Sequence, residues 1–380
     1  MTKFPHFDYI IIGNGLAGLQ LALKMASDEY FKNKTIALID PSTKNSNDKT
    51  WSFWDTSHSK WHNISYKTWS NAKIYTSRKA ISLQLAPYQY FSIRSIDFYT
   101  NAKLELGKHK NFHFIIDRVT SVTEGKVVKV TTTNITYSCK HVFDSRLPLD
   151  FYNHNNSINI TQHFKGIVIK TDTNVFDIDT LVMMDYRLKD GNKTSFMYVL
   201  PFAKNKALIE FTYFTKNLVE EHVYDTYIAT YIKNYLNIET YDILESEKGK
   251  IPMTTFPFNS YNTPNMTKIG TAGGWVKPST GYAFKHSENK ATQIITNIKA
   301  NKIPSYKLFK KRYKFYDKIF LKVLQDENDK GEWIFQQFYN KNNAKTMFRF
   351  LDEKSTLLEE FKIMKSLFSW TFIKAFFKTL

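Results

Sequence analysis

Residues 7–25 read FDYIIIGNGLAGLQLALKM, an apolar run followed by three spaced glycines and a helix-like pattern. Residues 9–12 are apolar at every position, which is typical of a strand buried on both faces of a parallel sheet. Gly13, Gly15 and Gly18 have GxGxxG spacing: the first permits a tight turn, the second admits a pyrophosphate, and the third lets helix and strand approach. The stretch therefore predicts the first strand and helix of a dinucleotide-binding fold.

A second apolar strand, residues 35–39, ends at Asp40, close to the spacing expected for the acid that binds a ribose hydroxyl. The helix over residues 16–25 would direct free N–H groups and the positive end of its dipole at the phosphates. The fingerprint leaves FAD and NAD open. A glycine-rich turn without a ligand is the alternative interpretation.

The composition narrows the classes of partner. The 380 residues suggest one large fold with a second module, and the 16% of aromatic residues favours an apolar ligand, a lipid-facing surface or a strand-rich protein. The net charge of +18 would suit nucleic acid or an anionic membrane, or it reflects a generally Lys-rich composition. Only seven of the 53 basic residues are Arg, so we expect no sequence-specific nucleic-acid binding.

Cysteine usage and apolar runs indicate the compartment. Cys139 is the only cysteine, so no disulfide can form within the chain and a reducing compartment is compatible. The first apolar run follows Asp8 and has no basic region before it, which indicates a strand and not a signal peptide. No stretch of about 18 uncharged apolar residues occurs, so we expect any membrane contact to be peripheral and on the cytoplasmic side.

The segment after the second strand is unusually aromatic. Residues 45–54, NSNDKTWSFW, place Trp51, Phe53 and Trp54 together, which suits packing over an elongated apolar ligand or, equally, a loop anchored in the core. Residues 69–86 are strand-like, and residues 91–107 are expected to form a helix with Ser95 as its cap. Arg94, just before the cap, would either contact a phosphate or be exposed.

The middle of the chain is rich in strands. Residues 112–130 indicate a small meander that turns at Glu124 and Gly125, and residues 141–146 return as a strand, as in flavoproteins with two dinucleotide-binding folds. From about residue 160 the segments HFKGIVIKT, TLVMMDYR, TSFMYVLPFA and ALIEFTYF predict an antiparallel sheet that forms one wall of a substrate cavity. Residues 219–236 are expected to be helical.

Residues 268–284, KIGTAGGWVKPSTGYAF, form a second candidate ligand segment before a helix over residues 287–298. Small residues here would bring backbone N–H groups against a phosphate or a flavin edge, which favours FAD bound by both ends of the chain. The predicted α/β fold is a Rossmann-like FAD-binding domain of the two-dinucleotide-fold flavoprotein type, an antiparallel substrate domain and a helical C-terminal region. Their predicted limits are residues 1–159 with 262–300, residues 160–261 and residues 301–380.

The segments FDYIIIGNGLAGLQLAL, DKTWSFW, MDYR, YVLPF, LIEFT, GKIPM and GGWVKPSTGYAF, in this order, resemble the lycopene beta-cyclase family. The resemblance covers roughly residues 7–298 and is looser beyond. It implies cyclisation of the acyclic ends of lycopene to beta rings, giving gamma-carotene and then beta-carotene, with no net redox change although reduced FAD and NAD(P)H are needed. The implied FAD contacts are Gly13, Gly15, Gly18, Asp40, Gly270, Thr271, Gly274, Pro278 and Gly281, and Arg94 is a further candidate from its position alone.

The resemblance also implies a catalytic acid, since Glu210 in LIEFT matches the family's essential carboxylate. A carboxyl kept dry among apolar side chains would have a raised pKa and could protonate an alkene, while aromatic faces stabilise the resulting cation. Strand alternation alone equally allows Glu210 to share a solvent-facing side with Lys204 and Lys206. Asp185 in MMDYR is a second acid candidate.

Two positions depart from the family pattern. Many cyclases carry a second acid directly after the catalytic Glu, where this chain has Phe211, and related flavoproteins carry an acid at the position of Thr271. We expect substrate contacts from aromatic residues and no metal site. The predicted substrate contacts are Trp51, Phe53, Trp54 and Phe211.

The C-terminal region is basic and aromatic: residues 301–380 contain 12 Phe and 17 Lys or Arg against nine acids. We expect residues 361–380 to form a helix that lies in the membrane interface or packs on the protein's own core. Lycopene cyclisation is the leading function. The alternatives are a FAD-dependent monooxygenase or reductase of a lipid-like substrate, which would consume NAD(P)H with each product, and a carotenoid or lipid carrier without catalysis.

Overall fold

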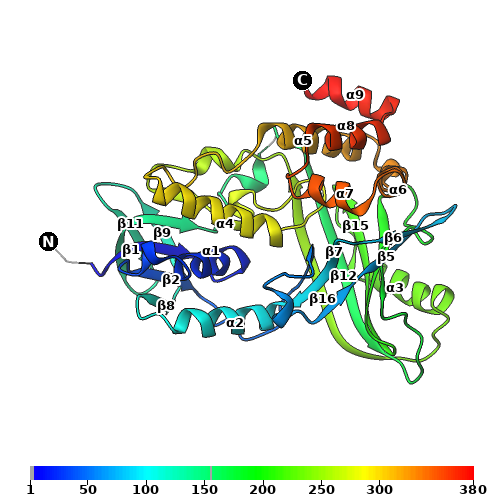
Figure 1. Cartoon of the computed structure of the whole chain (residues 1–380), viewed down its shortest axis with the longest axis horizontal. Helices are drawn as coiled ribbons and strands as arrows, with labels where there is room; N and C mark the ends of the chain where they lie inside the picture. Colours follow the sequence, from blue (N-terminus) through cyan, green and yellow to red (C-terminus); the bar gives the residue numbers. More distant parts are fainter. Residues whose placement is uncertain (1–3, 155) are drawn as a thin grey trace.

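The apolar run near the start of the chain forms β1 (His6–Ile12), which pairs in parallel with β2 and β11 and is buried at Ile10, Ile11 and Ile12. The computed structural model describes residues 4–154 and 156–380, and Figure 1 shows this first sheet at the N-terminal end of the molecule. Its order is β8-β2-β1-β11-β10-β9, with β17 also paired to β11. The other strands are β2 (Ile36–Asp40), β8 (Phe112–Ile116), β9 (Val119–Thr123), β10 (Val128–Thr132), β11 (Thr136–Asp144) and β17 (Met266–Lys268).

Helices pack on this sheet as the glycine pattern predicts. α1 (Leu16–Ala26) follows β1 directly and packs against α4 (Phe284–Lys299), which begins three residues earlier than expected. A Cβ added at Gly18 would lie 2.0 Å from the carbonyl oxygen of Gly13, so only glycine permits this close approach of helix and turn. The predicted Rossmann-like α/β fold is confirmed.

A small antiparallel sheet, in the order β3-β7-β4, is formed by residues that lie between β2 and β8 in the sequence. Residues 91–94, which we expected to be helical, end β7 instead, because Phe91 and Ile93 are buried against the partner strand β3. Ser95 does not cap α2 (Ser95–Gly107); its Oγ accepts hydrogen bonds from the backbone N–H groups of Asp48 and Lys49. The three strands are β3 (Thr50–Thr56), β4 (Lys67–Trp69) and β7 (Tyr88–Arg94).

The large sheet has the order β16-β12-β15-β14-β13-β5-β6 and is antiparallel except between β13 and β5. The predicted run of strands after residue 160 is confirmed, and the β5–β6 hairpin, from residues that we assigned to the FAD-binding domain, joins it. α3 (Glu221–Tyr235) covers one face. The strands are β5 (Asn71–Tyr75), β6 (Ala80–Gln84), β12 (Asn159–Lys170), β13 (Thr180–Asp185), β14 (Ser195–Ala203), β15 (Lys206–Thr215) and β16 (Asp242–Thr254).

The C-terminal helices lie along one side of the molecule (Figure 1). They are α5 (Lys311–Asp326), α6 (Gly331–Lys341), α7 (Ala344–Leu351), α8 (Leu357–Ser366) and α9 (Trp370–Thr379). The single helix expected over residues 361–380 is wrong, because Ser369 caps α9 by accepting a hydrogen bond from the Phe372 N–H and so separates α8 from α9. In the described part of the chain, no helix combines the length and apolar character needed to cross a bilayer.

Candidate active site

A cavity of about 880 Å³ lies between the large sheet, the small antiparallel sheet and the loop before α4. β12 and β15 contribute the floor, including Phe164, Glu210 and Thr212. β3 and β7 contribute Trp51 and Tyr90, and α6 adds aromatic side chains. This mostly apolar enclosure suits a long hydrophobic ligand.

Glu210 lies in this cavity and not on a solvent-facing side of the sheet. It is 7% exposed, and Thr212 Oγ1 donates a hydrogen bond to its Oε1. Burial, followed by the negative charge of Glu247, raises the pKa of Glu210 to about 8, while the Thr212 hydroxyl opposes the shift. The carboxyl is therefore held protonated near neutral pH, as a proton donor requires.

Three tyrosines form a connected hydroxyl cluster beside Glu210. Tyr198 donates to the Tyr90 hydroxyl oxygen at 3.0 Å, and the Tyr90 and Tyr282 hydroxyl oxygens lie 2.8 Å apart. Burial raises the pKa of all three well above the ordinary value, so they remain neutral. All three line the cavity, where they offer electron-rich rings without an anionic nucleophile.

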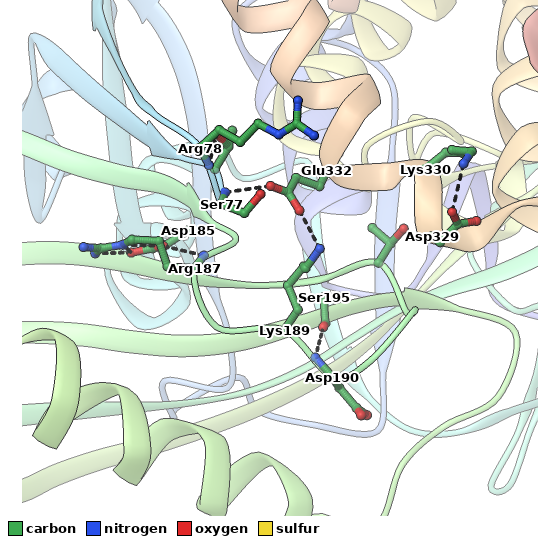
Figure 2. Close-up of polar contacts among 12 residues, drawn as sticks. Ser77, Arg78, Asp185, Arg187, Lys189, Asp190, Ser195, Asp329, Lys330 and Glu332 are labelled. Carbon is green, nitrogen blue, oxygen red and sulfur yellow. Dashed lines mark hydrogen bonds and ion pairs between the residues drawn. The ribbon is translucent and has the colours of Figure 1, made fainter.

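Asp185, the second acid candidate, lies apart from this cavity. Its carboxylate pairs with Arg187 (Figure 2). It also accepts a hydrogen bond from the Tyr231 hydroxyl at 2.8 Å. It is fully buried at the end of β13 and is not among the side chains that line the cavity. Both carboxylate oxygens are engaged by structural partners, so we do not include Asp185 in the candidate site.

Only one of the four predicted aromatic substrate contacts lines the cavity, namely Trp51. Phe53 stacks on Phe284 with ring centroids 4.1 Å apart, and Trp54 stacks on Phe348 at 4.5 Å; both contacts are part of the core. Phe211 stacks on Tyr227 of α3 at 4.6 Å. Its adjacency to Glu210 explains this, because consecutive strand residues point to opposite faces.

The glycine-rich turn and the loop before α4 converge. Gly13 has a φ of +102°, and Gly270, at φ +62°, packs so close to α1 that an added Cβ would lie 3.2 Å from the Cβ of Ala17. Asp40 lies beside the turn, where its Oδ2 accepts a hydrogen bond from the Asn14 N–H at 2.7 Å. The two motifs, which lie far apart in the sequence, thus form one site.

The geometry of this site fits a dinucleotide such as FAD. The N-cap of α1 is Gly15, no side chain caps the free N–H groups of the helix, and a Cβ at Gly15 would meet no atom within 4 Å. An anion can therefore approach the helix end. Within the described residues, Gln162 Oε1 and Thr280 Oγ1 are buried without a hydrogen-bond partner, and both residues line the cavity.

The remaining predicted cofactor residues are divided between two cavities. Thr271 lines both the large cavity and a neighbouring one of about 280 Å³, and Gly281 lines the large one, whereas Gly274 and Pro278 line only the smaller one. Between Gly274 and Pro278, Lys277 pairs with Asp317 at 2.9 Å and Glu353 at 3.1 Å, which fixes the loop to the C-terminal helices.

Arg94 is not placed with the glycine-rich turn. Its guanidinium pairs with Asp97 at 2.7 Å, lies over the ring of Tyr66 and lines a small cavity of about 30 Å³. The same small cavity is lined by Thr50, which also lines the large cavity, and by Glu247, which accepts a hydrogen bond from Thr50 Oγ1 at 2.9 Å.

The sequence reasoning missed the tyrosine cluster, Thr212 and Glu247. Tyr198 and Tyr282 lie inside the motifs YVLPF and GGWVKPSTGYAF, so those motifs carried the signal. Thr212 follows Glu210 with the period of two that puts both on one face. Glu247 gave no local signal, because its position depends on how β16 pairs with β12.

The chain is similar to a known protein family, to curated plant proteins and to solved structures. The family model described as "Lycopene cyclase protein" matches residues 8–377. A neoxanthin synthase from Solanum tuberosum is 26% identical over 310 residues, and a lycopene beta cyclase from Arabidopsis thaliana is 25% identical over 316 residues; each match covers 74% of this chain and 58% of the relative. The chain thus spans less than two thirds of these curated relatives. A geranylgeranyl bacteriochlorophyll reductase-like protein from Thermoplasma acidophilum, 13% identical, shares the fold over 100% of both chains with a TM-score of 0.65.

Proposed function

The chain belongs to the lycopene cyclase family, and from this premise we propose that it is a lycopene beta-cyclase that converts acyclic lycopene ends into beta rings. Gamma-carotene is then the product of the first cyclisation and beta-carotene that of the second. The observation that carries the proposal is the buried Glu210 carboxyl, whose pKa is raised to about 8 inside an aromatic cavity.

Protonation of a trisubstituted alkene needs a donor that stays protonated, lies close to the alkene and is kept dry, because the alkene is a very weak base. Glu210 supplies the proton and becomes a carboxylate while a tertiary cation forms on the polyene. The neighbouring double bond closes the ring, and loss of one ring proton completes the beta ring. The polyene gains one proton and loses one proton, so its composition does not change, as an isomerisation requires.

The cation must be stabilised without being trapped. The neutral rings of Tyr90, Tyr198 and Tyr282 supply negative potential through their faces, and their raised pKa values prevent a phenolate from forming. Two aromatic side chains of α6, Phe335 and Tyr339, also line the cavity and would limit the access of water to the cation. Water would otherwise add to the cation and give an alcohol.

FAD is the cofactor that we propose for the converging glycine motifs, with NAD(P)H as its reductant. Gly13, Gly15 and the free N–H groups of α1 would hold the pyrophosphate, Asp40 would lie near the ribose, and Thr271 and Gly281 would face the flavin. Reduced FAD, when bound, supplies negative charge beside the cavity.

We also propose peripheral attachment to the cytoplasmic side of a membrane, since lycopene dissolves only in lipid. α8 and α9 leave large apolar side chains outside: Phe361 is 63% exposed, and Trp370 and Phe377 are each 68% exposed. Lys362, Lys365, Lys374 and Lys378 lie on the same two helices. An apolar face interspersed with lysines matches an anionic lipid surface.

Expression in a lycopene-accumulating bacterium tests the proposed reaction. We expect conversion to bicyclic or monocyclic carotene of unchanged mass, and no conversion with Glu210→Gln, whose protein should still bind FAD. A product heavier by oxygen or hydrogen, with NAD(P)H consumed in proportion to product, would instead support the monooxygenase or reductase. Unchanged lycopene in cells with folded wild-type protein would support a carrier.

A further inference from the structure

Glu247 lies on the same rung of the large sheet as Glu210. Gly166 of β12 pairs with Glu210 of β15 on one side and with Glu247 of β16 on the other. Residues directly opposite in neighbouring strands point to the same face, so both glutamates lie on the cavity side of the sheet. Their Cα atoms are two strands apart, which is roughly 10 Å.

Gly166 leaves the space between these two glutamates free of a side chain. An ideal Cβ at Gly166 would lie 3.2 Å from Glu210 Cβ and 3.0 Å from Leu208 Cδ1, so any side chain here would crowd the gap. Two glutamate side chains, each about 4–5 Å long, can approach one another over the glycine directly or through one water. The negative charge of Glu247 accordingly contributes to the raised pKa of Glu210.

Glu247 also lies closer to solvent than Glu210 does. β16 is the edge strand of the large sheet, and Glu247 is half-buried there, whereas Glu210 lies two strands further in. Glu247 lines the small cavity, and it accepts a hydrogen bond from Thr50, the residue that lines both cavities. Glu245, two residues before it on the same strand, is exposed.

We propose that Glu247 is a positioning carboxyl that exchanges the proton of Glu210 with water, so that the two acids hold one catalytic proton across Gly166. This inference rests on the proposed cyclisation. When Glu210 protonates the polyene, its O–H bond breaks and a C–H bond forms. The ring proton lost later returns to the pair, and Glu247 exchanges it with solvent before the next cyclisation.

Charged and titratable groups surround both acids. Tyr90 of β7, Tyr198 of β14 and Tyr282 before α4 carry neutral rings toward Glu210, and Lys250 of β16 also lines the large cavity. Around Glu247 the small cavity is lined by Glu245 of β16, Lys206 of β15, Arg94 of β7 and Tyr66. Burial and the Glu245 charge raise the pKa of Glu247 to about 7, close to that of Glu210, which suits transfer between the two.

An infrared titration of the FAD-loaded, full-length protein tests the pairing without lycopene. The C=O band of protonated Glu210 is identified by its loss in Glu210→Gln. We expect Glu247→Gln to lower the midpoint of this band by about one pH unit, because a nearby negative charge is removed. Glu245→Gln is the matched control and should move the midpoint far less, because Glu245 acts on Glu247 and not directly on Glu210, while Glu247→Asp should restore most of it. An unchanged midpoint in Glu247→Gln overturns the proposal.

Deuterium incorporation in D₂O tests the exchange. Wild-type protein should place about one deuterium in each ring, since the donated proton comes from an exchanged acid and the lost one from the substrate. In Glu247→Gln, Glu210 should recycle the ring proton, so deuterium per ring falls below about one half over repeated turnovers, with kcat reduced about tenfold and KM unchanged. Full incorporation in Glu247→Gln contradicts the proposal. If no variant cyclises lycopene, the proposed function fails and the infrared result still decides the pairing.

Discussion

At the scale of single residues, Glu210 and Thr212 both lie on the face of β15 that lines the cavity. The alternation along β15 showed that Lys206, Glu210 and Thr212 share a face, and it could not say which face is buried, because burial depends on what packs over the sheet. The same alternation excludes Phe211 from the cavity. Glu247 was not predicted as part of the site, because its position beside Glu210 depends on the register of β16 on β12. Local sequence patterns do not predict this register.

Removal of the Glu210 charge should stabilise the protein at alkaline pH. The pKa of Glu210 is raised to about 8, above the value of an unfolded chain, so the folded state binds more protons and the free energy of unfolding falls as pH rises between about 4.5 and 8. Glu210→Gln should therefore be more stable than wild type at pH 8.5, by on the order of 3 kcal/mol, with the difference shrinking toward pH 4.5. Urea unfolding at both pH values measures it.

Glu245→Gln, at an exposed position, is the control for this stability measurement and should show no comparable pH-dependent gain. An equal difference from wild type at pH 4.5 and pH 8.5 would mean that Glu210 does not titrate between them.

The Thr212 hydroxyl should tune the pH range of activity. Its hydrogen bond to Glu210 favours the carboxylate, so Thr212→Val should raise the pKa of Glu210 further. The proposed reaction uses the protonated acid, so the alkaline limit of activity should move upward by about half a pH unit. The pH profile of kcat measures the shift. Thr215→Val, on the opposite face beside His163, should leave the limit in place; a Thr212→Val profile identical to wild type would exclude this role.

At the scale of elements, the segments with a strong apolar pattern were predictable, and the exact boundaries between helices and strands were not. β1, α1 and the strands after residue 160 follow from apolar periodicity and glycine spacing. Residues 91–94 were predicted to be helical because a helix follows them directly in the sequence. In the structure they belong to β7, where pairing with β3 buries Phe91 and Ile93. The break before α9 depends on one hydroxyl cap at Ser369, which is a weak signal inside an aromatic run.

The glycine-rich turn offers a matched pair of variants. Gly15→Ala meets no atom within 4 Å in the protein, so its stability without FAD should match wild type, whereas its FAD affinity should fall at least about tenfold because the methyl occupies the approach to α1. Gly18→Ala places a Cβ 2.0 Å from the Gly13 carbonyl oxygen and should destabilise the fold by several kcal/mol. Thermal unfolding without FAD and fluorescence titration with FAD separate the two effects. Normal FAD affinity in Gly15→Ala would contradict the assigned site.

At the scale of the whole molecule, several contacts join segments that lie far apart in the sequence, and local sequence patterns do not predict these contacts. The β5–β6 hairpin crosses from the N-terminal part of the chain into the large sheet, and β13 receives it in parallel. Lys277 joins the loop before α4 to α5 and to Glu353 through buried ion pairs. The predicted division, residues 1–159 with 262–300, residues 160–261 and residues 301–380, does not include these connections, because each depends on contacts between segments far apart in sequence.

The exposed aromatic side chains of α8 and α9 should govern membrane binding. Combined Phe361→Ser, Trp370→Ser and Phe377→Ser should weaken binding to anionic lipid vesicles at least about tenfold. Each of these exposed aromatic side chains would bury apolar area in the lipid when the protein binds. Activity on lycopene in detergent micelles should persist. Vesicle flotation at low and high salt measures binding, and Ile116→Ser on β8, also exposed, is the control. Equal flotation of the triple variant and wild type would exclude this surface.

The stacked contact between Trp54 of β3 and Phe348 of α7 has a consequence for how the protein is made. A ribosome that adds about 5–20 residues per second emits Trp54 some tens of seconds before Phe348, roughly 300 residues later. Throughout that interval Trp54 lacks the ring that stacks on it in the folded protein. The small sheet is therefore fully packed only late in synthesis, and the growing chain is a natural client for chaperones that shield exposed aromatic surface.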